Sequence, residues 1–366
     1  MRIAYLFNSS TPSSNPGSIQ VVNTCSAIAK LSHDIKLIAP DTGLKTSLSE
    51  FYGIQKSPKF IRLKFFDKFP LGINYYLFSL WAVFYGLLNK TEIYITRNFF
   101  TLILLNLLKK KVIIEVHHDL ENESRLVKFF YRNFNIFYNH NIIKIVAITH
   151  SVKKYLINSF KIDKKKIHVI PSASSLNFKF KKLKKKKKYN IGFFGSLDKS
   201  KGSNFIISLS QKDKTNNYFI YGGKPYEVKK LKKNIPKNLK IYPSVAYSKI
   251  KSHLSKMDIL LMPSNTKKLR SLGGIGNIAK FTSPLKLFDY LATGKLIITS
   301  NLKVFQEILT DKKNCIIINK LDVNNWEKKI KQVKNQLFKI NNIKKNAYIL
   351  SKNYTYKIRA KKILDF

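Results

Sequence analysis

The sequence predicts an α/β protein made of two Rossmann-like domains that face each other across a cleft. Short β-branched runs alternate with helical patterns along the whole chain, as they do around parallel sheets. A lysine-rich run at 178–190 interrupts this alternation once. In addition, 366 residues exceed what one hydrophobic core usually supports, so two domains are expected.

The first half of the chain holds a series of short apolar runs separated by helical segments such as 18–32 and 150–160. Strand, helix, strand is the elementary parallel unit, and its repetition predicts a doubly wound sheet. Residues 1–178 are expected to form this domain. Its strands are predicted at 2–7, 35–40, 92–97, 111–118, 144–149 and 167–172.

The basic run that follows has little to bury and predicts a solvated linker at 179–189. The alternation then resumes, so residues 190–345 are expected to form the second domain. Ligands of such sheets bind at the carboxyl ends of the strands. Strands are predicted at 190–196, 217–223, 239–244, 258–264, 295–300 and 315–320.

The formal net charge of +48 raises the question of a polyanionic partner, either nucleic acid or an acidic membrane surface. The lysines are spread over the whole chain together with many asparagines and isoleucines, which equally fits a compositional drift at exposed positions. Because no nucleic-acid-binding signature accompanies them, no nucleic-acid partner is expected. Peripheral contact with an anionic membrane stays open.

Cysteine usage and the first residues indicate the compartment. Cys25 and Cys315 have no neighbours at metal-ligand or redox spacing, which fits a reducing environment and predicts no metal site. The N-terminus resembles a buried strand rather than a secretory signal, so a cytoplasmic protein is expected. The uncharged stretch 71–89 approaches the roughly 20 residues of a membrane span. A buried or interface-lying helix is favoured, and a spanning helix remains the alternative.

A helix is predicted at 283–295. Ser283 can cap it, Pro284 suits the first helical position and Gly294 can end it. Lys286 and Asp289 lie three residues apart, on one face near a helix start that attracts anions. The alternative is an ordinary amphipathic helix with two solvated charges.

These segments resemble the glycosyltransferases of family 4 (glycosyl transferases group 1), which have the GT-B fold. In the second half, 190–202 is similar to the family's glycine turn with a following Lys-Gly pair, and 283–300 to its donor-binding helix and next strand. The resemblance implies that 346–366 form a C-terminal helix returning to the first domain. Further similar segments, in the family's order, are 15–23, 115–120, 145–156, 168–173, 257–264, 305–319 and 354–364.

The resemblance implies a donor site in the second domain. The backbone around Ser283, Pro284, Leu285 and Lys286 would face the diphosphate of a nucleotide sugar, and Asp289 would accept hydrogen bonds from ribose hydroxyls. Lys201, next to the glycine turn at Gly195, would act catalytically by offsetting the charge of the leaving diphosphate. A surface lysine is the alternative for Lys201.

In the first domain, the resemblance implies that His117 is catalytic and contacts the donor sugar, and that Gly17 and Ser18 lie in a loop near the phosphates and the acceptor. Glu115 and His117 should share one face of a strand, with His118 on the other. The alternatives are a core histidine, a role for His118, and a plain turn at Gly17.

Three departures from the family pattern stand out. Asp289 stands where the family often has a glutamate, and Phe281 occupies the position of an acid that often lies near the sugar. Ser196 follows Gly195 where the family has an arginine. Arg270 or another basic residue could replace that arginine.

The resulting hypothesis is a retaining glycosyltransferase that moves a sugar from a nucleotide-diphosphate sugar to a glycan or lipid-linked acceptor. The expected setting is cell-surface polysaccharide or lipopolysaccharide synthesis at the inner face of the membrane, with no cofactor or metal besides the donor substrate. The alternatives are a sugar-nucleotide epimerase of the same fold and a non-enzymatic basic module that binds nucleic acid or anionic lipid.

Overall fold

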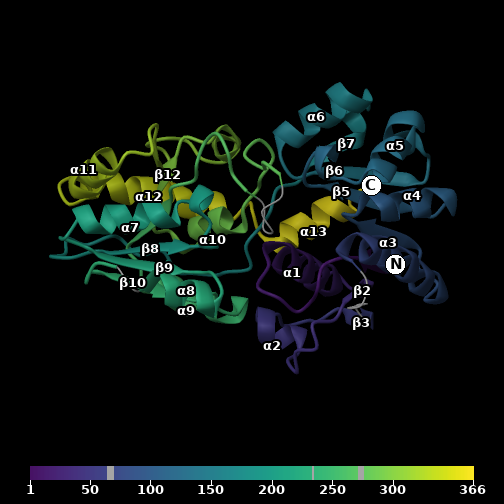
Figure 1. The fold of residues 1–366 in the computed structure, drawn as a ribbon, viewed down its shortest axis with the longest axis horizontal. Coiled ribbons are helices and arrows are strands. Elements are labelled where there is room, and N and C mark those ends of the chain that lie inside the picture. The colour runs from purple at the N-terminus through teal and green to yellow at the C-terminus, as the bar shows by residue number, and fades with distance from the viewer. Residues whose placement is uncertain (64–69, 233–234, 271–275) are drawn as a thin grey trace. The chain divides into compact units, whose positions relative to one another are not determined.

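The computed structural model describes residues 1–63, 70–232, 235–270 and 276–366 (Figure 1). Its contacts divide the chain into two compact units, each built around one parallel sheet. The first unit comprises Met1–Ser172 and Tyr356–Phe366, and the second comprises Ala173–Thr355. The predicted boundaries, at 178 and 345, therefore differ from those of the structure. The predicted fold class, two Rossmann-like α/β domains, is confirmed.

The sheet of the first unit has the order β3-β2-β1-β4-β5-β6-β7, with parallel neighbours throughout. Six strands overlap the predicted runs, and two of these begin earlier than predicted, β2 by one residue and β6 by two. The exception is β3, whose Lys59 and Arg62 are exposed, so no buried periodicity marked it in the sequence. The strands are β1 Arg2–Leu6, β2 Asp34–Pro40, β3 Lys59–Leu63, β4 Ile93–Thr96, β5 Val112–Val116, β6 Ile142–Ala147 and β7 Ile167–Val169.

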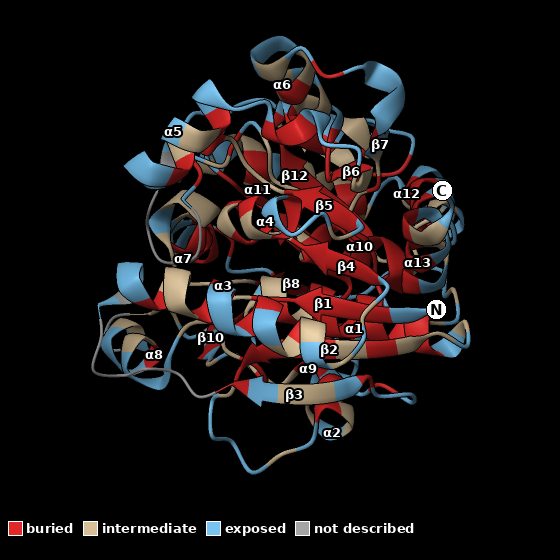
Figure 2. Cartoon of the chain, turned by 90° about the vertical axis from the view of Figure 1, so that its right-hand side faces the viewer, coloured by how far each residue is buried: buried red, intermediate tan, exposed pale blue. Residues whose placement is uncertain are grey.

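The helices of the first unit connect these strands and cover the sheet (Figure 2). The last of them, α13, comes from the end of the chain and packs against α1. The predicted returning segment thus begins at Tyr356 rather than at 346, because 346–351 still belong to α12 of the second unit. The helices are α1 Pro16–Lys30, α2 Leu48–Tyr52, α3 Leu71–Leu88, α4 Phe99–Leu107, α5 Arg125–Asn133, α6 His150–Phe160 and α13 Tyr356–Leu364.

The second unit has a sheet of order β10-β9-β8-β11-β12-β13, again with parallel neighbours. Its strands all fall within the predicted runs. They are β8 Asn190–Phe194, β9 Asn217–Tyr221, β10 Leu239–Tyr242, β11 Ile259–Met262, β12 Leu296–Ser300 and β13 Ile316–Ile318. The helices are α7 Ser203–Lys212, α8 Pro225–Leu231, α9 Tyr247–Ser255, α10 Leu285–Thr293, α11 Val323–Val333 and α12 Leu337–Ser351.

This sheet is buried on both faces. Along β11, Ile259 and Leu261 enter one apolar cluster, whereas Leu260 and Met262 enter another. Because successive side chains of a strand point to opposite faces, the two clusters are the cores on the two sides of the sheet. The uninterrupted apolar runs of the sequence follow from this double burial.

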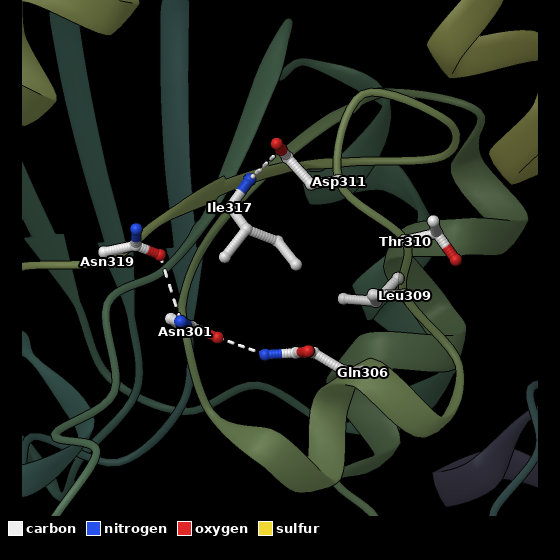
Figure 3. A pocket seen from close by; sticks show the side chains of 7 residues that line it. All are labelled: Asn301, Gln306, Leu309, Thr310, Asp311, Ile317 and Asn319. Carbon is white, nitrogen blue, oxygen red and sulfur yellow. Dashed lines mark hydrogen bonds between the residues drawn. The ribbon is translucent and has the colours of Figure 1, made fainter.

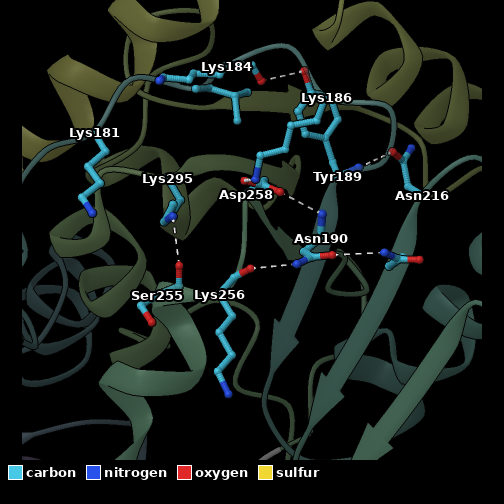
Figure 4. Close-up of polar contacts among 12 residues, drawn as sticks. Lys181, Lys184, Lys186, Tyr189, Asn190, Asn216, Ser255, Lys256, Asp258 and Lys295 are labelled. Atoms are coloured by element: carbon cyan, nitrogen blue, oxygen red, sulfur yellow. Dashed lines mark hydrogen bonds and ion pairs between the residues drawn. The ribbon is translucent and has the colours of Figure 1, made fainter.

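The basic segment 179–189 is not the solvated linker that its lysines predicted. It packs onto the second unit: Leu183 is buried, its amide donates to Asn341 Oδ1 at 2.6 Å, and Lys344 Nζ donates to the Lys181 carbonyl at 2.9 Å. Lys186 pairs with Asp258 at 2.7 Å (Figure 4). Leu183 and Tyr189 are buried and anchor the segment, while the lysines at 184–188 stay exposed, so a highly charged run can still pack onto the domain.

The uncharged stretch forms the helix α3, Leu71–Leu88. Within the described residues, no helix has the length and hydropathy needed to cross a bilayer.

Candidate functional site

In the second unit, the predicted glycine turn follows β8. The backbone of Gly195 lies so close to the loop after β9 that a Cβ atom on Gly222 would come within 1.7 Å of the Gly195 carbonyl oxygen. Lys201 ends a 3₁₀ turn at Lys199–Lys201, and its Nζ donates to Ser196 Oγ at 2.9 Å. The following Gly202 has a φ of 93°, which favours glycine. These turns hold the ammonium group of Lys201 beside the residue that follows Gly195.

Helix α10 begins one residue later than the sequence predicted. Pro284, not Ser283, occupies the N-cap position, and no side chain caps the helix. The prediction of a Ser283 cap is therefore wrong, because the proline with its extended backbone separates the serine from the first turn. The first amides of a helix have no acceptor within it, so this start stays suited to an anion. Gly294, with a φ of 60°, ends the helix as predicted.

Lys286, in the first turn of α10, is not a solvated charge. Its Nζ is buried and has no hydrogen-bond partner among the described residues. It lies 4.5 Å from the centre of the Phe193 ring and 3.5 Å from the point where a Cβ atom on Gly195 would be. Burial, and then the charge of Lys201, lower the pKa of Lys286 to about 7. Two cations thus converge on the turn after β8.

Asp289 lies on the same helix and is 6% exposed. Its Oδ1 accepts hydrogen bonds from Ser174 Oγ at 2.6 Å and from Tyr247 Oη at 2.8 Å. Burial raises the pKa of Asp289 to about 6 against the opposing effect of these two donors. The carboxylate therefore already has two hydroxyl donors from the protein, and its predicted contact with ribose stays a prediction. Sequence reasoning missed Ser174 and Tyr247, which no local pattern marks.

The basic residue beside Gly195 is Lys286, whereas Arg270 is exposed and is linked to this region through its backbone amide, which donates to Ser200 Oγ at 3.0 Å. Phe281, at the position of the family's acid, is half-buried.

In the first unit, His117 directly follows β5. Its Nε2 lies 3.2 Å from Glu115 Oε2, so both residues share one face of the strand, as predicted. Burial, and then the charge of Arg97, lower the pKa of His117 to about 3, so the ring is neutral. His118 turns away, with Nδ1 2.7 Å from the Asp119 carbonyl oxygen.

Glu115 is in turn bound by Arg359 of α13, with 2.8 Å between Nη2 and Oε1 and both side chains buried. Burial alone would raise the pKa of Glu115, but the pair with Arg359 lowers it to about 2. This carboxylate thus fixes the orientation of His117. Sequence reasoning missed Arg359, since it lies 244 residues away in the chain.

Gly17 and Ser18 lie in the first turn of α1. The Ser18 hydroxyl is fully buried, donates to the Ser10 carbonyl at 3.1 Å and accepts from Ser13 Oγ at 3.0 Å. It therefore holds the preceding loop, and only the backbone is left to meet a ligand. Gly17 faces the guanidinium group of Arg97, a residue that sequence reasoning did not single out.

The predicted site residues thus form two groups. Gly195, Lys201, Ser283, Pro284, Leu285, Lys286 and Asp289 belong to the second unit, and Gly17, Ser18 and His117 to the first. The roles assigned to them stay predictions.

A pocket of about 330 Å³ lies elsewhere in the second unit, after β12 and β13 (Figure 3). None of the predicted residues lines it. Its amides bind one another: Asn301 donates to Asn319 at 3.0 Å, and Gln306 donates to Asn301. Across the described residues, no group of three or more histidine, cysteine or acidic side chains is placed to hold a metal ion.

Comparisons with known families and structures cover both units. Residues 174–349 match the family model described as glycosyl transferases group 1, and residues 17–176 match that of glycosyltransferase family 4. A search of curated proteins gives no significant match.

Solved structures match over almost the whole chain. Sucrose-phosphate synthase from Thermosynechococcus elongatus is 13% identical with a TM-score of 0.73, over 99% of this chain and 97% of that one. Anabaena HepE, solved with UDP and glucose, is 15% identical with a TM-score of 0.72, over 100% and 98%. WaaG, a glycosyltransferase of lipopolysaccharide biosynthesis, is 11% identical with a TM-score of 0.67, over 100% of both chains. At these identities the likeness is one of fold.

Proposed function

Since the chain belongs to the family 4 glycosyltransferases of the GT-B fold, we propose that it moves a sugar from a nucleotide-diphosphate sugar to a glycan or lipid-linked acceptor, with retention of configuration. One observation carries the proposal. Lys286 is a buried cation without a hydrogen-bond partner among the described residues, and it lies against the glycine turn at the start of an uncapped helix.

A diphosphate would satisfy this arrangement. Burying an ammonium group without an acceptor costs free energy, and a phosphate oxygen beside Lys286 would recover that cost. The α10 start adds the favourable end of the helix dipole. Lys201, already held by Ser196 at 2.9 Å, adds a second positive charge. HepE, of the same fold, was solved with UDP.

The same groups account for the chemistry. As the bond between the anomeric carbon and the diphosphate breaks, its electron pair passes to the diphosphate oxygen, where Lys201 and Lys286 stabilise the growing negative charge. The acceptor hydroxyl bonds to the anomeric carbon on the face that the diphosphate leaves, and its proton passes to the departing oxygen. His117, whose neutral ring donates from Nε2 to Glu115, offers Nδ1 as an acceptor to a sugar hydroxyl. No cofactor besides the donor is part of the proposal.

We further propose that α3 lies on an anionic membrane surface, where a lipid-linked acceptor would be found. Helix α3 is apolar on both of its faces: Phe78, Ala82 and Val83 are buried, whereas Ile73, Leu80, Trp81, Phe84 and Leu88 are between 43% and 62% exposed. Figure 2 shows exposed residues along this helix. Aromatic and aliphatic side chains on a solvent-facing helix are typical of a membrane interface.

The surroundings of α3 indicate an anionic lipid surface rather than a second copy of the chain. Helix α4 packs against α3, ends in exposed Leu107 and Leu108, and is followed at once by Lys109, Lys110 and Lys111. Basic residues beside an apolar face favour acidic headgroups. Two copies of a chain with a net charge of +48 would instead repel each other.

The alternative of a non-enzymatic basic module that binds nucleic acid is disfavoured, because several of its lysines are already engaged. Lys186 and Lys295 donate to acceptors of their own unit (Figure 4), and so does Lys344. The pair Lys201 and Lys286 does not distinguish a transferase from an epimerase, because both reactions need the donor site.

The test is a thermal-shift screen of the whole chain against nucleotide-diphosphate sugars, followed by product analysis with and without a lipid-linked or glycan acceptor. We expect one donor to raise the midpoint of thermal unfolding. A transferred sugar should appear only when the acceptor is present. A changed sugar nucleotide without acceptor would indicate the epimerase, and no shift with any donor would contradict the proposal.

Membrane contact is tested by co-sedimentation with vesicles of phosphatidylglycerol and phosphatidylcholine. The variant Trp81→Gln/Phe84→Gln should lose binding, whereas Phe338→Gln, which changes an 84% exposed residue of the second unit, should keep it. Equal binding by both variants would exclude α3 as the contact.

A further inference from the structure

Arg97 lies directly after β4, beside the first turn of α1. The centre of its guanidinium group is 5.8 Å from the centre of the Phe7 ring. Its Nη1 is 3.6 Å from the point where a Cβ atom on Gly17 would be, and the same Cβ would meet Phe7 Cζ at 3.3 Å. The absence of a side chain at Gly17 therefore lets the guanidinium group lie against the start of the helix.

Nη1 of this guanidinium group is buried and has no hydrogen-bond partner in the part of the chain that the structure describes. Glu115, the acid whose charge acts on it, is already bound by Arg359 at 2.8 Å and by His117 at 3.2 Å. Burial lowers the pKa of Arg97 from its ordinary value. A nitrogen of a charged group is thus desolvated without an acceptor, which costs free energy in the absence of a ligand.

The N-terminus of α1 also carries a partial positive charge. This helix has 15 residues, its N-cap residue Asn15 makes no capping hydrogen bond, and its first turn holds no acid. The first amides of a helix attract an anion through their open N–H groups and the helix dipole. A cation and a helix start therefore converge on one place at the carboxyl edge of the sheet.

His117 adds an acceptor close by. The charge of Arg97 is among the causes that keep its ring neutral. With Nε2–H directed at Glu115, the lone pair of Nδ1 is left for a hydroxyl group. The combination suits a sugar or polyol that carries a negative group next to a free hydroxyl.

We propose that Arg97 and the first turn of α1 bind an oxyanion, a phosphate or a carboxylate, and that this group belongs to the acceptor. Binding of the oxyanion does not depend on the proposed function, and only its assignment to the acceptor rests on that function. The donor diphosphate is the other source of the same chemistry, so the experiment must separate the two.

The probe is inorganic phosphate, titrated calorimetrically into the full chain at constant ionic strength in a Lys286→Met background, in which the proposed donor site is weakened. Arg97→Met should lower the remaining phosphate affinity about tenfold or more, and Arg97→Lys should retain part of it. Arg125→Met, which changes an exposed arginine of the same unit, should leave it unchanged. Unaltered phosphate binding in Arg97→Met would overturn the proposal.

Thermal unfolding without ligand distinguishes a binding role from a structural one. Arg97 is half-buried and its buried Nη1 has no partner among the described residues, so the thermal unfolding midpoint of Arg97→Met should be unchanged or higher. A midpoint lowered by several degrees would show that Arg97 holds the fold together and would overturn the proposal.

The source of the oxyanion is decided with UDP-glucose as the donor probe. An unchanged UDP-glucose affinity in Arg97→Met supports the acceptor, and an affinity that falls in parallel with that for phosphate overturns the assignment to the acceptor. Failure of the wild-type chain to bind any nucleotide sugar would instead count against the proposed function.

Discussion

The ammonium group of Lys286 lies 3.5 Å from the point where a Cβ atom on Gly195 would be, and 4.5 Å from the centre of the Phe193 ring. No hydrogen-bond acceptor from the described residues reaches it. A lysine in such surroundings destabilises the fold unless an anion joins it. The contact between Lys286 and the glycine turn is therefore best understood as half of a binding site.

Lys286→Met tests this directly. The methionine fills similar space without the charge, so the affinity for a nucleotide-diphosphate sugar should fall about tenfold or more, which isothermal titration calorimetry measures. The ligand-free protein should melt at a higher temperature, because the cost of burying the cation is gone. Lys280→Met, at an exposed position nearby, should change neither quantity. An unchanged donor affinity would contradict the assignment of Lys286.

The pH dependence of donor binding gives a second test. The pKa of Lys286 is lowered to about 7, so the free protein loses this positive charge as the pH rises through neutrality. The diphosphate of a nucleotide sugar keeps its charge over the same range, and the affinity should therefore decline above pH 7, by at most about tenfold per pH unit.

Titrations between pH 6 and 9 at constant ionic strength measure this decline. Lys286→Arg, whose side chain stays protonated, should show a flatter profile. If the wild type and Lys286→Arg follow the same curve, the titrating group is another residue.

Asp289→Asn should separate stability from binding. Burial raises the pKa of Asp289 to about 6, above its unfolded value, so the folded protein binds more protons than the unfolded one between about pH 4 and 6. The native carboxylate therefore destabilises the fold above pH 6, and this cost disappears as the pH falls below about 4. At pH 7.5 the neutral amide should stabilise the protein by about 1–3 kcal/mol relative to the wild type.

Urea unfolding at pH 7.5 and at pH 4 measures the difference in the free energy of unfolding between Asp289→Asn and the wild type. This difference should be smaller at pH 4. Donor affinity should meanwhile fall if the carboxylate binds ribose. Tyr247→Phe removes one donor to Oδ1 at 2.8 Å while keeping the charge, and it should destabilise the fold by about 1 kcal/mol. If Asp289→Asn is less stable than the wild type at pH 7.5, the buried carboxylate does not destabilise the fold and the prediction is wrong.

The sequence was sufficient for the elements whose pattern is local. Buried parallel strands read as continuous apolar runs, and Gly294 marks the end of α10 through its left-handed φ of 60°. The charged edge strand β3 was missed because its exposed Lys59 and Arg62 leave no such run. Local pattern also failed at Ser283, where capping depends on the backbone angle of the proline that follows.

The electrostatic part of the site was less predictable, because it depends on contacts between distant segments. Ser174 donates to Asp289 across 115 residues of sequence, and no pattern near either residue predicts this hydrogen bond. A buried lysine cannot be recognised among so many exposed ones, so Lys286 could be placed by its helix but not by its burial. The order of the segments, by contrast, carried the family resemblance and with it the fold.

The buried ion pair between Arg359 and Glu115 provides the last prediction. Arg359 also donates from Nη1 to the carbonyls of Ile170 and Pro171, both at 2.7 Å, so this one side chain adds three polar contacts to the packing of α13 against α1. In Arg359→Met, the carboxylate would remain buried without its partner, and the loss of stability should be about 3–5 kcal/mol.

Urea unfolding of Arg359→Met at pH 7 measures this loss, with Lys357→Met, an exposed position on the same helix, as the unaffected control. The pair lowers the pKa of Glu115 to about 2, so its contribution is present above the unfolded pKa and is lost as the pH falls from about 4.5 toward 2. The difference between the wild type and Arg359→Met should therefore narrow below pH 4.5. Glu115→Gln/Arg359→Met, which removes both charges, should be more stable than Arg359→Met alone. A double variant as unstable as Arg359→Met would mean that the stranded charge is not the source of the loss.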